Sequence, residues 1–590
     1  MGKGERGARP SLFEPRRVRY AQEGVTFCVA ESGDCLRHVP PVASAIRKCG
    51  VMDEAGEQRR FVLAREMVIF RRASRVHQFL FMKGTLFTSS MRLAWALCCA
   101  SLAMSISPLM AQEDEDAVRA REEVVLFPFD DDGIPFNKNL LMTLIAGDKS
   151  STQDAKHPNK PVLGIGGKED PDGRRVYFAG TVLQVGDEYR MWYSGYDKEA
   201  SRHLCYAVSK DGVHWEKPKL GLVTYKGNKA NNLLSIDGDQ RVKASLFLVL
   251  HDPEDPDPSR RFKMARENDP NNSVRVAFSA DGLSWKSAAG GKFVFAAEPS
   301  GLTKHQGLYY LNGHAGAVRH PVSGAHKRTM QTFVSADFEN WTEAAHMSFR
   351  RDNIPPRPIM DFDFNRGEQV HTGASLWNRG NVVLGFYGQY HAQDSDRRNC
   401  SVDIGLLVSP DALHFKEPIP DFRIVPSAEE VDRAEPRLTQ GQAFLNIGDR
   451  TLFYYGIWTE VNRDGPTGVR VATWTRDRLG YFRVAPGMKG AHCISAAITP
   501  PRDGARLYLN ASGLSEESQL AVEILNESFR PVAGYAAADC TPIKDKTGLR
   551  IPISWGGKKD LGKQGKPIRV RVNFSGEGAE AARLFAIYVR

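Results

Sequence analysis

Ser209-Lys210-Asp211-Gly212-Val213-His214-Trp215 is a stretch that recurs along this chain, and it decides the predicted fold. Its frame is Ser or Thr, any residue, Asp, and then an aromatic side chain four residues after the Asp. The copies are Ser209-x-Asp211…Trp215, Ser279-x-Asp281…Trp285, Ser335-x-Asp337…Trp341, Ser409-x-Asp411…Phe415 and Thr475-x-Asp477…Tyr481. Their aspartates are 70, 56, 74 and 66 residues apart. Recurrence at this spacing indicates a repeated supersecondary unit.

Each copy follows a short run rich in β-forming residues, such as 204–208 or 274–278. A strand, an Asp-bearing turn and an aromatic residue that begins the next strand together describe a hairpin. An Asp in such a turn accepts main-chain N–H bonds, so we interpret the repeated aspartates as structural. Serial repetition of hairpins is typical of a β-propeller. We therefore predict an all-β chain with a five-bladed propeller over residues 165–486.

The chain on either side of the repeats has a different pattern. Residues 487–590 contain short alternating strands, for example 520–525 and 568–573, separated by turn-rich segments. This pattern predicts a small C-terminal β-sandwich. Residues 112–164 are rich in Asp, Gly, Pro and Lys, and we interpret them as a lead-in with little regular periodicity.

Composition limits the class of protein. The chain has 590 residues, 42% of them hydrophobic and 25% charged, as in an ordinary soluble globular protein. Its formal net charge is +9, but residues 1–90 hold 13 Arg and 3 Lys against 7 Glu and 2 Asp, a local charge of +7. The repeats therefore carry no basic surface of the kind that binds nucleic acid, and we expect no nucleic-acid partner.

The N-terminal part indicates export. Residues 91–111, or a segment starting at residue 82, combine a positive start, an apolar core and small residues before an acidic run. This is the pattern of a signal peptide, and it predicts a secreted or periplasmic protein with no membrane association beyond the export signal. A single membrane anchor is the alternative. The Arg-rich extension 1–90 precedes the signal and is excluded from the fold prediction.

A propeller gathers the first strands of its blades around an axis, and side chains at one end converge on a funnel. Counting back from the turn after each first strand gives one rim residue for each blade. These residues are Tyr177, Lys243, Glu298, His371 and Gln440. We predict that Tyr177, Lys243, His371 and Gln440 contact a substrate bound in the funnel.

The stretch Glu298-Pro299-Ser300-Gly301-Leu302-Thr303-Lys304-His305-Gln306-Gly307-Leu308-Tyr309-Tyr310-Leu311 resembles the third-blade segment of five-bladed propeller glycosidases of the invertase-like and arabinanase/xylosidase-like families. The resemblance covers about residues 165–486, and the trailing sandwich matches the invertase-like layout. It implies that Glu298 is the general acid of a glycosidase. The chain departs from the family at the first-blade position, where Tyr177 replaces an Asp, and at the second-blade rim, which has Lys243.

Glycoside hydrolysis needs a second carboxyl group on the other side of the bond that breaks. Asp361, Asp363 and Glu368 precede the fourth rim position and are the candidates. The sequence therefore predicts an exported protein that hydrolyses or recognises a carbohydrate with a Glu acid. A carbohydrate-binding propeller that has lost the first-blade Asp is the alternative, and a propeller used only for protein contacts is a third interpretation.

No cofactor is predicted, because no phosphate loop or dinucleotide fingerprint stands out. The aspartates and histidine in 251–257 include ligand types that Ca²⁺ prefers, but interleaved prolines favour a solvated loop. A structural calcium ion in this loop is the only metal that the sequence suggests.

Overall fold

The structure is a computed structural model that describes residues 123–149, 161–238, 246–268, 273–288, 294–314, 317–319, 326–351, 366–394, 396, 399–427, 437–457, 468–501, 503–545 and 547–590. All of them belong to the compact unit Trp95–Arg590. The extension 1–90 and the predicted signal 91–111 lie outside the described residues. None of the helices in the described part has the length and hydropathy that a membrane crossing requires.

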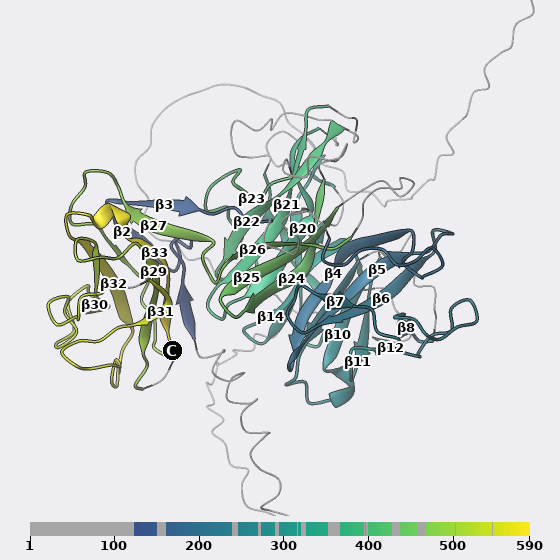
Figure 1. Ribbon diagram of the computed structural model, residues 1–590, viewed down its shortest axis with the longest axis horizontal. Coiled ribbons are helices and arrows are strands. Elements are labelled where there is room, and N and C mark those ends of the chain that lie inside the picture. The colour runs from purple at the N-terminus through teal and green to yellow at the C-terminus, as the bar shows by residue number, and fades with distance from the viewer. Residues whose placement is uncertain are drawn as a thin grey trace, which may run out of the picture. The chain divides into compact units, whose positions relative to one another are not determined.

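The repeat region folds into antiparallel sheets, drawn in blue to green in Figure 1. The first contains β4 (Arg175–Val185), β5 (Glu188–Tyr196), β6 (Arg202–Ser209) and β7 (Trp215–Glu216). The second contains β9 (Phe247–His251), β10 (Phe262–Asn268), β11 (Ser273–Ser279) and β12 (Ser284–Ser287), with β8 (Ser235–Ile236) parallel to β12, β13 (Phe295–Ala296) beside β11, and the 3-10 helix η1 (Pro258–Arg260).

The remaining repeats continue this arrangement. The third sheet contains β14 (Glu298–His305), β15 (Leu308–His314), β18 (Met330–Ser335) and β19 (Thr342–Phe349), and the pair β16 (Ala317–Arg319) and β17 (His326–Arg328) stands apart from it. The fourth contains β20 (Gly367–Asn378), β21 (Val383–Ala392), β22 (Ser401–Ser409) and β23 (Arg423–Val425). The fifth contains β24 (Leu438–Ile447), β25 (Arg450–Ile457) and β26 (Arg470–Thr475).

The first strands of successive sheets contact one another in a closed order. Strand β4 contacts β9, β9 contacts β14, β14 contacts β20, β20 contacts β24, and β24 returns to β4. A single parallel pair, Gln442 with Thr181, joins the fifth sheet to the first. The prediction of an all-β fold is confirmed. The cyclic order is the one that the five-blade prediction requires, and the blade count itself remains a prediction.

The repeated turn has the geometry that its sequence predicts in the first four copies. In the first copy, Asp211 Oδ1 accepts the main-chain N–H groups of Val213 and His214, each at 2.8 Å. Gly212 has a φ of 75°, a conformation that glycine adopts without strain. The same carboxylate pattern recurs at Asp281, Asp337 and Asp411.

The turn also joins neighbouring sheets. The Gly212 carbonyl accepts Trp215 Nε1–H of its own turn at 3.1 Å and the hydroxyl of Tyr454, from the fifth sheet, at 2.6 Å. In the second copy, the Gly282 carbonyl accepts Trp285 Nε1–H at 3.1 Å and Trp192 Nε1–H, from the first sheet, at 2.8 Å. In both copies the motif tryptophan therefore donates to the glycine carbonyl that also accepts a hydrogen bond from the preceding sheet.

The fifth copy is a different turn. Asp477 itself takes the positive φ, 60°, and its side chain is fully buried. Its carboxylate accepts Arg379 Nη1 at 2.5 Å, from the turn between β20 and β21, and the hydroxyl of Tyr588 at 2.8 Å. The expectation that every motif aspartate binds its own turn is wrong for Asp477, because that carboxylate ion-pairs with an arginine of the fourth sheet.

The lead-in and the C-terminal region fold together. One sheet has the order β3 (Leu140–Leu144), β27 (Gly480–Val484), β33 (Arg583–Val589), β29 (Leu507–Ser512) and β31 (Gly548–Pro552), with β1 (Val124–Leu126) also pairing β33. The other has the order β2 (Phe136–Lys138), β28 (His492–Ile494), β32 (Ile568–Ser575) and β30 (Gln519–Asn526), and the 3-10 helix η4 (Ala579–Ala581) precedes β33. The lead-in is therefore more regular than its composition predicts, since it supplies β1, β2 and β3.

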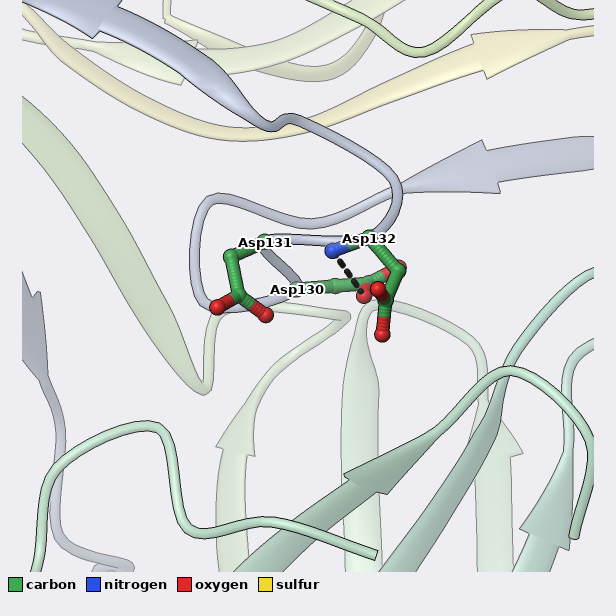
Figure 2. Close-up of side chains that lie close together, drawn as sticks. All are labelled: Asp130, Asp131 and Asp132. Atoms are coloured by element: carbon green, nitrogen blue, oxygen red, sulfur yellow. Dashed lines mark hydrogen bonds between the residues drawn. The ribbon is translucent and has the colours of Figure 1, made fainter. Parts of the chain in front are cut away.

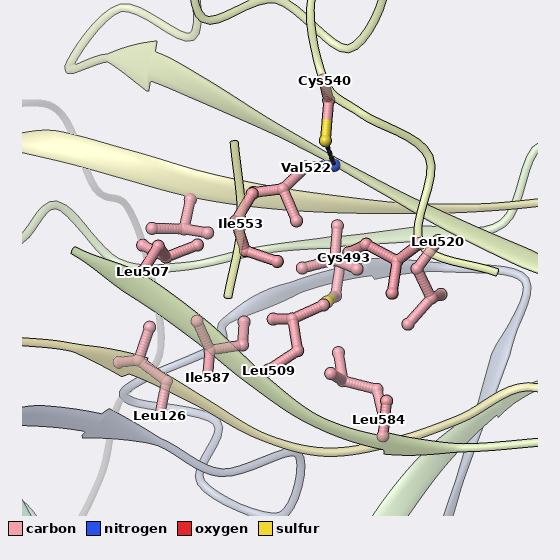
Figure 3. Close-up of a cluster of buried hydrophobic side chains, with 14 of the residues drawn as sticks. Leu126, Cys493, Leu507, Leu509, Leu520, Val522, Cys540, Ile553, Leu584 and Ile587 are labelled. Atoms are coloured by element: carbon pink, nitrogen blue, oxygen red, sulfur yellow. Dashed lines mark hydrogen bonds between the residues drawn. The ribbon is translucent and has the colours of Figure 1, made fainter. Parts of the chain in front are cut away.

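One apolar cluster draws side chains from both of these sheets. Leu507 and Leu509 of β29 and Leu520 and Val522 of β30 are all buried in it (Figure 3). This shared core is what the predicted C-terminal sandwich requires, and the sandwich remains a prediction. The lead-in also reaches the fifth sheet, where Asp148 and Thr473 exchange main-chain hydrogen bonds of 2.9 Å. Strand β27 follows the fifth turn but pairs with β3 and β33.

Candidate functional site at the convergence of the first strands

Four of the first strands share an irregularity at the same place. The pairing register shifts between Tyr177 and Thr181 in β4, between Pro299 and Gly301 in β14, between His371 and Ala374 in β20, and between Gln440 and Phe444 in β24. A Cβ atom on Gly301 would lie 1.9 Å from the carbonyl oxygen of Ala374. Only glycine allows this approach, so the first strands of the third and fourth sheets lie very close together at this bulge.

The side chain of Gln440 connects three sheets at this point. Its Nε2 lies 3.0 Å from Ser300 Oγ on β14 and 2.9 Å from Thr372 Oγ1 on β20. The carbonyl oxygens of His371 and Gly373 lie 3.0 and 2.7 Å from the same nitrogen. An amide nitrogen has two hydrogens for these acceptors, so the cluster holds more acceptors than Gln440 can satisfy at once. The predicted rim residues Gln440 and His371 are therefore brought together.

Tyr177 lies at the same end of the first sheet. The side chains of Tyr177 and Thr439 are hydrogen-bonded, and burial of the phenol raises the pKa of Tyr177 to about 12. The Arg175 guanidinium stands 4.9 Å from the centre of the Tyr177 ring and 5.3 Å from that of Tyr196. Tyr177 is thus a neutral phenol beside a cation, where the resembled family has an acid. Lys243 falls outside the described residues.

Glu298 is the first residue of β14 and is partly exposed. It pairs with His314 of β15 and precedes Ser300, which contacts Gln440, by two residues. The strand that carries Glu298 therefore enters the convergence point directly. The candidates Asp361 and Asp363 lie outside the described residues.

Glu368, the third candidate for the second carboxylate, belongs to a charged cluster on β20. Its Oε2 lies 2.8 Å from Arg351 Nη2 and 2.8 Å from His391 Nδ1. His391 Nε2 lies 3.1 Å from Asp403 Oδ2, which also lies 3.1 Å from Arg423 Nε. Glu368 is therefore a member of a chain of alternating charges.

The histidine of this cluster responds to both carboxylates. Burial by itself lowers the pKa of His391, but hydrogen bonds to Asp403 and Glu368 outweigh burial and raise the pKa above its ordinary value. Sequence reasoning missed His391 and Asp403. An acidic residue within the buried strand Ser401–Ser409 was the available signal, because a carboxylate in that setting needs a cationic partner.

Two groups of acidic residues elsewhere have the ligand types of a metal site. In the segment considered for calcium, Lys304 Nζ lies 2.9 Å from Asp252 and Lys263 Nζ lies 2.6 Å from Asp255. Asp257 accepts the main-chain N–H of Ser259 at 2.9 Å, at the start of η1. Because lysine ammonium groups already neutralise two of these carboxylates, the segment is a poor calcium site.

Figure 2 shows the second group, Asp130, Asp131 and Asp132, in the lead-in. Burial raises the pKa of Asp130 to about 6, and its Oδ1 accepts the Asp132 N–H at 3.2 Å. Lys416 Nζ pairs with Asp131 and lies 2.8 Å from Asp132. This group is therefore also neutralised by a lysine.

Comparison with known proteins gives structural neighbours and no sequence family. No family model and no curated protein matches the chain. A glycosyl hydrolase from Bacteroides ovatus is 15% identical, with a TM-score of 0.38, over 57% of this chain and 95% of that one. A structure described under the GH130 family, whose glycoside hydrolases target β-1,2 mannosidic linkages in Candida mannan, is 15% identical, with a TM-score of 0.36, over 57% of this chain and 95% of that one.

An exo-β-1,3-galactanase from Phanerochaete chrysosporium, in a structure with β-1,3-galactotriose, is 12% identical, with a TM-score of 0.33, over 73% of this chain and all of that one. The descriptions of these structures name enzymes that act on glycosidic bonds.

Proposed function

We propose that this protein is a glycosidase-like protein that binds a saccharide where its first strands converge and hydrolyses a glycosidic bond there, with Glu298 as the general acid. The observation that carries the proposal is the contact of Gln440 with Ser300 and Thr372. It holds together β14 and β20, the strands that bear Glu298 and Glu368. Hydroxyl, amide and carboxyl groups from several sheets are the groups that orient sugar hydroxyls and transfer protons to a glycosidic oxygen.

The surroundings of the two glutamates suit different roles. A general acid must hold a proton that it can release, whereas a nucleophile or base must be ionised. Glu368 is bound by Arg351 and His391, so it would have to give up two cationic partners to act as an acid. We assign Glu298 as the acid and Glu368 as the second carboxylate, with Asp361 and Asp363 as the alternatives for the second role.

A carbohydrate-binding propeller without catalysis is the second candidate function. The observation that favours it is the state of Tyr177, the residue at the first-blade position where the resembled glycosidases have an Asp. A phenol is neutral near pH 7, and burial raises the pKa of Tyr177 further, to about 12, so Tyr177 does not supply the charge of a carboxylate. Under this alternative the converging side chains bind a sugar, and Glu368 has only an ion-pairing role.

The two functions are separated by incubating purified protein with a panel of neutral and acidic oligosaccharides, and by measuring new reducing ends and binding heat. For a hydrolase, Glu298→Gln lowers kcat by about 100-fold or more, the usual contribution of a general acid. The matched control is Glu216→Gln, an exposed glutamate on the outer strand β7. Equal kcat in wild type and Glu298→Gln removes Glu298 from the mechanism. Binding without any product supports the alternative.

A further inference from the structure

A cavity of about 480 Å³ lies where the lead-in, the fifth sheet and the strands β29 and β33 meet. Its walls include Arg450 at the start of β25, Arg478 after β26, and Arg583 at the start of β33. The nearly buried side chains of Trp474 of β26 and Phe585 of β33 complete part of the lining. This volume is within the range of sites for small ligands.

The cavity arginines have no carboxylate partner among the described residues, although other arginines of the chain do. Arg379 lies 2.5 Å from Asp477, and Arg550 lies 2.6 Å from Glu123. Arg478 instead donates to neutral acceptors, the side-chain oxygen of Asn510 at 2.9 Å and the carbonyl of Ala511 at 3.3 Å. A guanidinium group held by neutral partners keeps its charge available for an anion.

Arg478 is also fixed in place by an aromatic ring. Its guanidinium stands 4.4 Å from the centre of the Phe585 ring. Partial burial lowers the pKa of Arg478, as expected for a cation that has left water without gaining a counter-charge. Trp474 is fixed too, because its Nε1 donates to the carbonyl of Ile145 at 2.8 Å. Arg478 and Trp474 are therefore both held in place in the cavity wall before any ligand binds.

Two aspartates, Asp148 and Asp449, also line the cavity. A simple inorganic anion gains nothing from them. A sugar bearing an oxyanion does, because carboxylates accept hydrogen bonds from sugar hydroxyls while arginines bind the anionic group. Arginines that outnumber carboxylates thus favour a ligand that carries both an anionic group and hydroxyl groups.

We propose that this cavity is a second saccharide-binding site, separate from the convergence point, for a sugar unit that carries a carboxylate or sulfate group. That the ligand is a saccharide rests on the proposed function, whereas the need for an anion rests on the arginines alone. The site would hold an acidic polysaccharide on the protein while another part of the same polysaccharide is hydrolysed at the convergence point.

The test is titration calorimetry with the full chain carrying Glu298→Gln, so that no probe is consumed. The probes are digalacturonate, a sulfated galactose disaccharide, neutral galactobiose and sodium sulfate. We expect an acidic disaccharide to bind at least ten-fold more tightly than galactobiose, and more weakly as salt rises. Digalacturonate and the sulfated probe separate carboxylate from sulfate as the anionic group. Equal affinity for the neutral and acidic disaccharides, or binding of sulfate alone as tight as that of any saccharide, overturns the proposal.

Substitutions in the cavity lining test whether the acidic disaccharide binds there. The double variant Arg450→Gln/Arg583→Gln changes one partly buried and one exposed arginine, and it should weaken binding of the acidic disaccharide about ten-fold or more. The control Arg530→Gln, at an exposed position, should leave this binding unchanged. Ser512→Trp keeps the arginines but fills the space, and should also abolish binding. Folding is checked by thermal melting. Undiminished binding in both cavity variants refutes this site. If the wild type hydrolyses no saccharide while cavity binding is intact, the proposed function is refuted and this site is not.

Discussion

The buried ion pair of Asp477 and Arg379 connects the fourth sheet, the fifth turn and, through Tyr588, the C-terminal strands. Its contribution to the free energy of unfolding can be measured. The Asp477 side chain is fully buried and that of Arg379 nearly so. Removing one partner of a buried pair leaves an uncompensated charge, which costs about 3–5 kcal/mol. We expect Asp477→Asn to lower the free energy of unfolding by that amount at pH 7, because Arg379 loses its counter-charge.

The pKa of Asp477 gives a second, independent value for how much the pair with Arg379 stabilises the folded state. Burial raises it, but the Arg379 charge and the hydrogen bonds from Arg379, Asn446 and Tyr588 outweigh burial and lower it from 3.8 to about 2. A depression of this size corresponds to about 2–3 kcal/mol of stability. Because the folded-state pKa is depressed, this contribution is present above about pH 4 and is lost as the pH falls towards 2. The wild type and Asp477→Asn should therefore converge in stability at acid pH.

The assay is urea unfolding followed by tryptophan fluorescence, at pH 7 and at pH 3, on Asp477→Asn, Arg379→Met and the double variant. The double variant should be more stable than the sum of the single effects predicts, by about 1–3 kcal/mol, because it leaves no orphan charge. The control is Asp211→Asn in the exposed first turn, which should cost about 1 kcal/mol or less. Additive effects of the two single changes would refute the ion-pair account.

Three further outcomes are expected. The raised pKa of His391 implies that its ion pairs with Glu368 and Asp403 stabilise the protein fully below about pH 6.5 and weaken as the pH rises through the raised value. His391→Gln should therefore make the melting temperature less dependent on pH between pH 5 and 9. Gln440→Leu should lower the free energy of unfolding by about 1–3 kcal/mol in urea titrations, because buried acceptors lose their donor; an unchanged stability would show that the convergence cluster contributes nothing. Gly212→Ala should lower the melting temperature more than Gly186→Ala. Both positions have positive φ, but of the two only Gly212 would bring a Cβ against another side chain, 2.7 Å from the Tyr454 hydroxyl. Equal effects of the two variants would contradict the role of the turn in joining sheets.

The sequence by itself determined the all-β fold and most of the turn chemistry. Strand alternation and an Asp-bearing turn are local properties, expressed within about ten residues, so they can be read before any long-range contact is known. Tyr177, His371 and Gln440 were also placed at the ends of first strands by counting, because a repeated unit keeps its internal distances. The roles of these residues and of Glu298 remain predictions.

The tertiary structure decided what depends on partners far away in the chain. Asp477 fits the same sequence frame as Asp411, and Arg379 and Tyr588 become its neighbours only when separate sheets pack together. In the same way, Glu368 is an isolated acid in the sequence and a member of an ion-pair chain in the fold. Charges act through space and over a few ångströms, so their partners follow from packing, whereas strands and turns follow from the order of neighbouring residues.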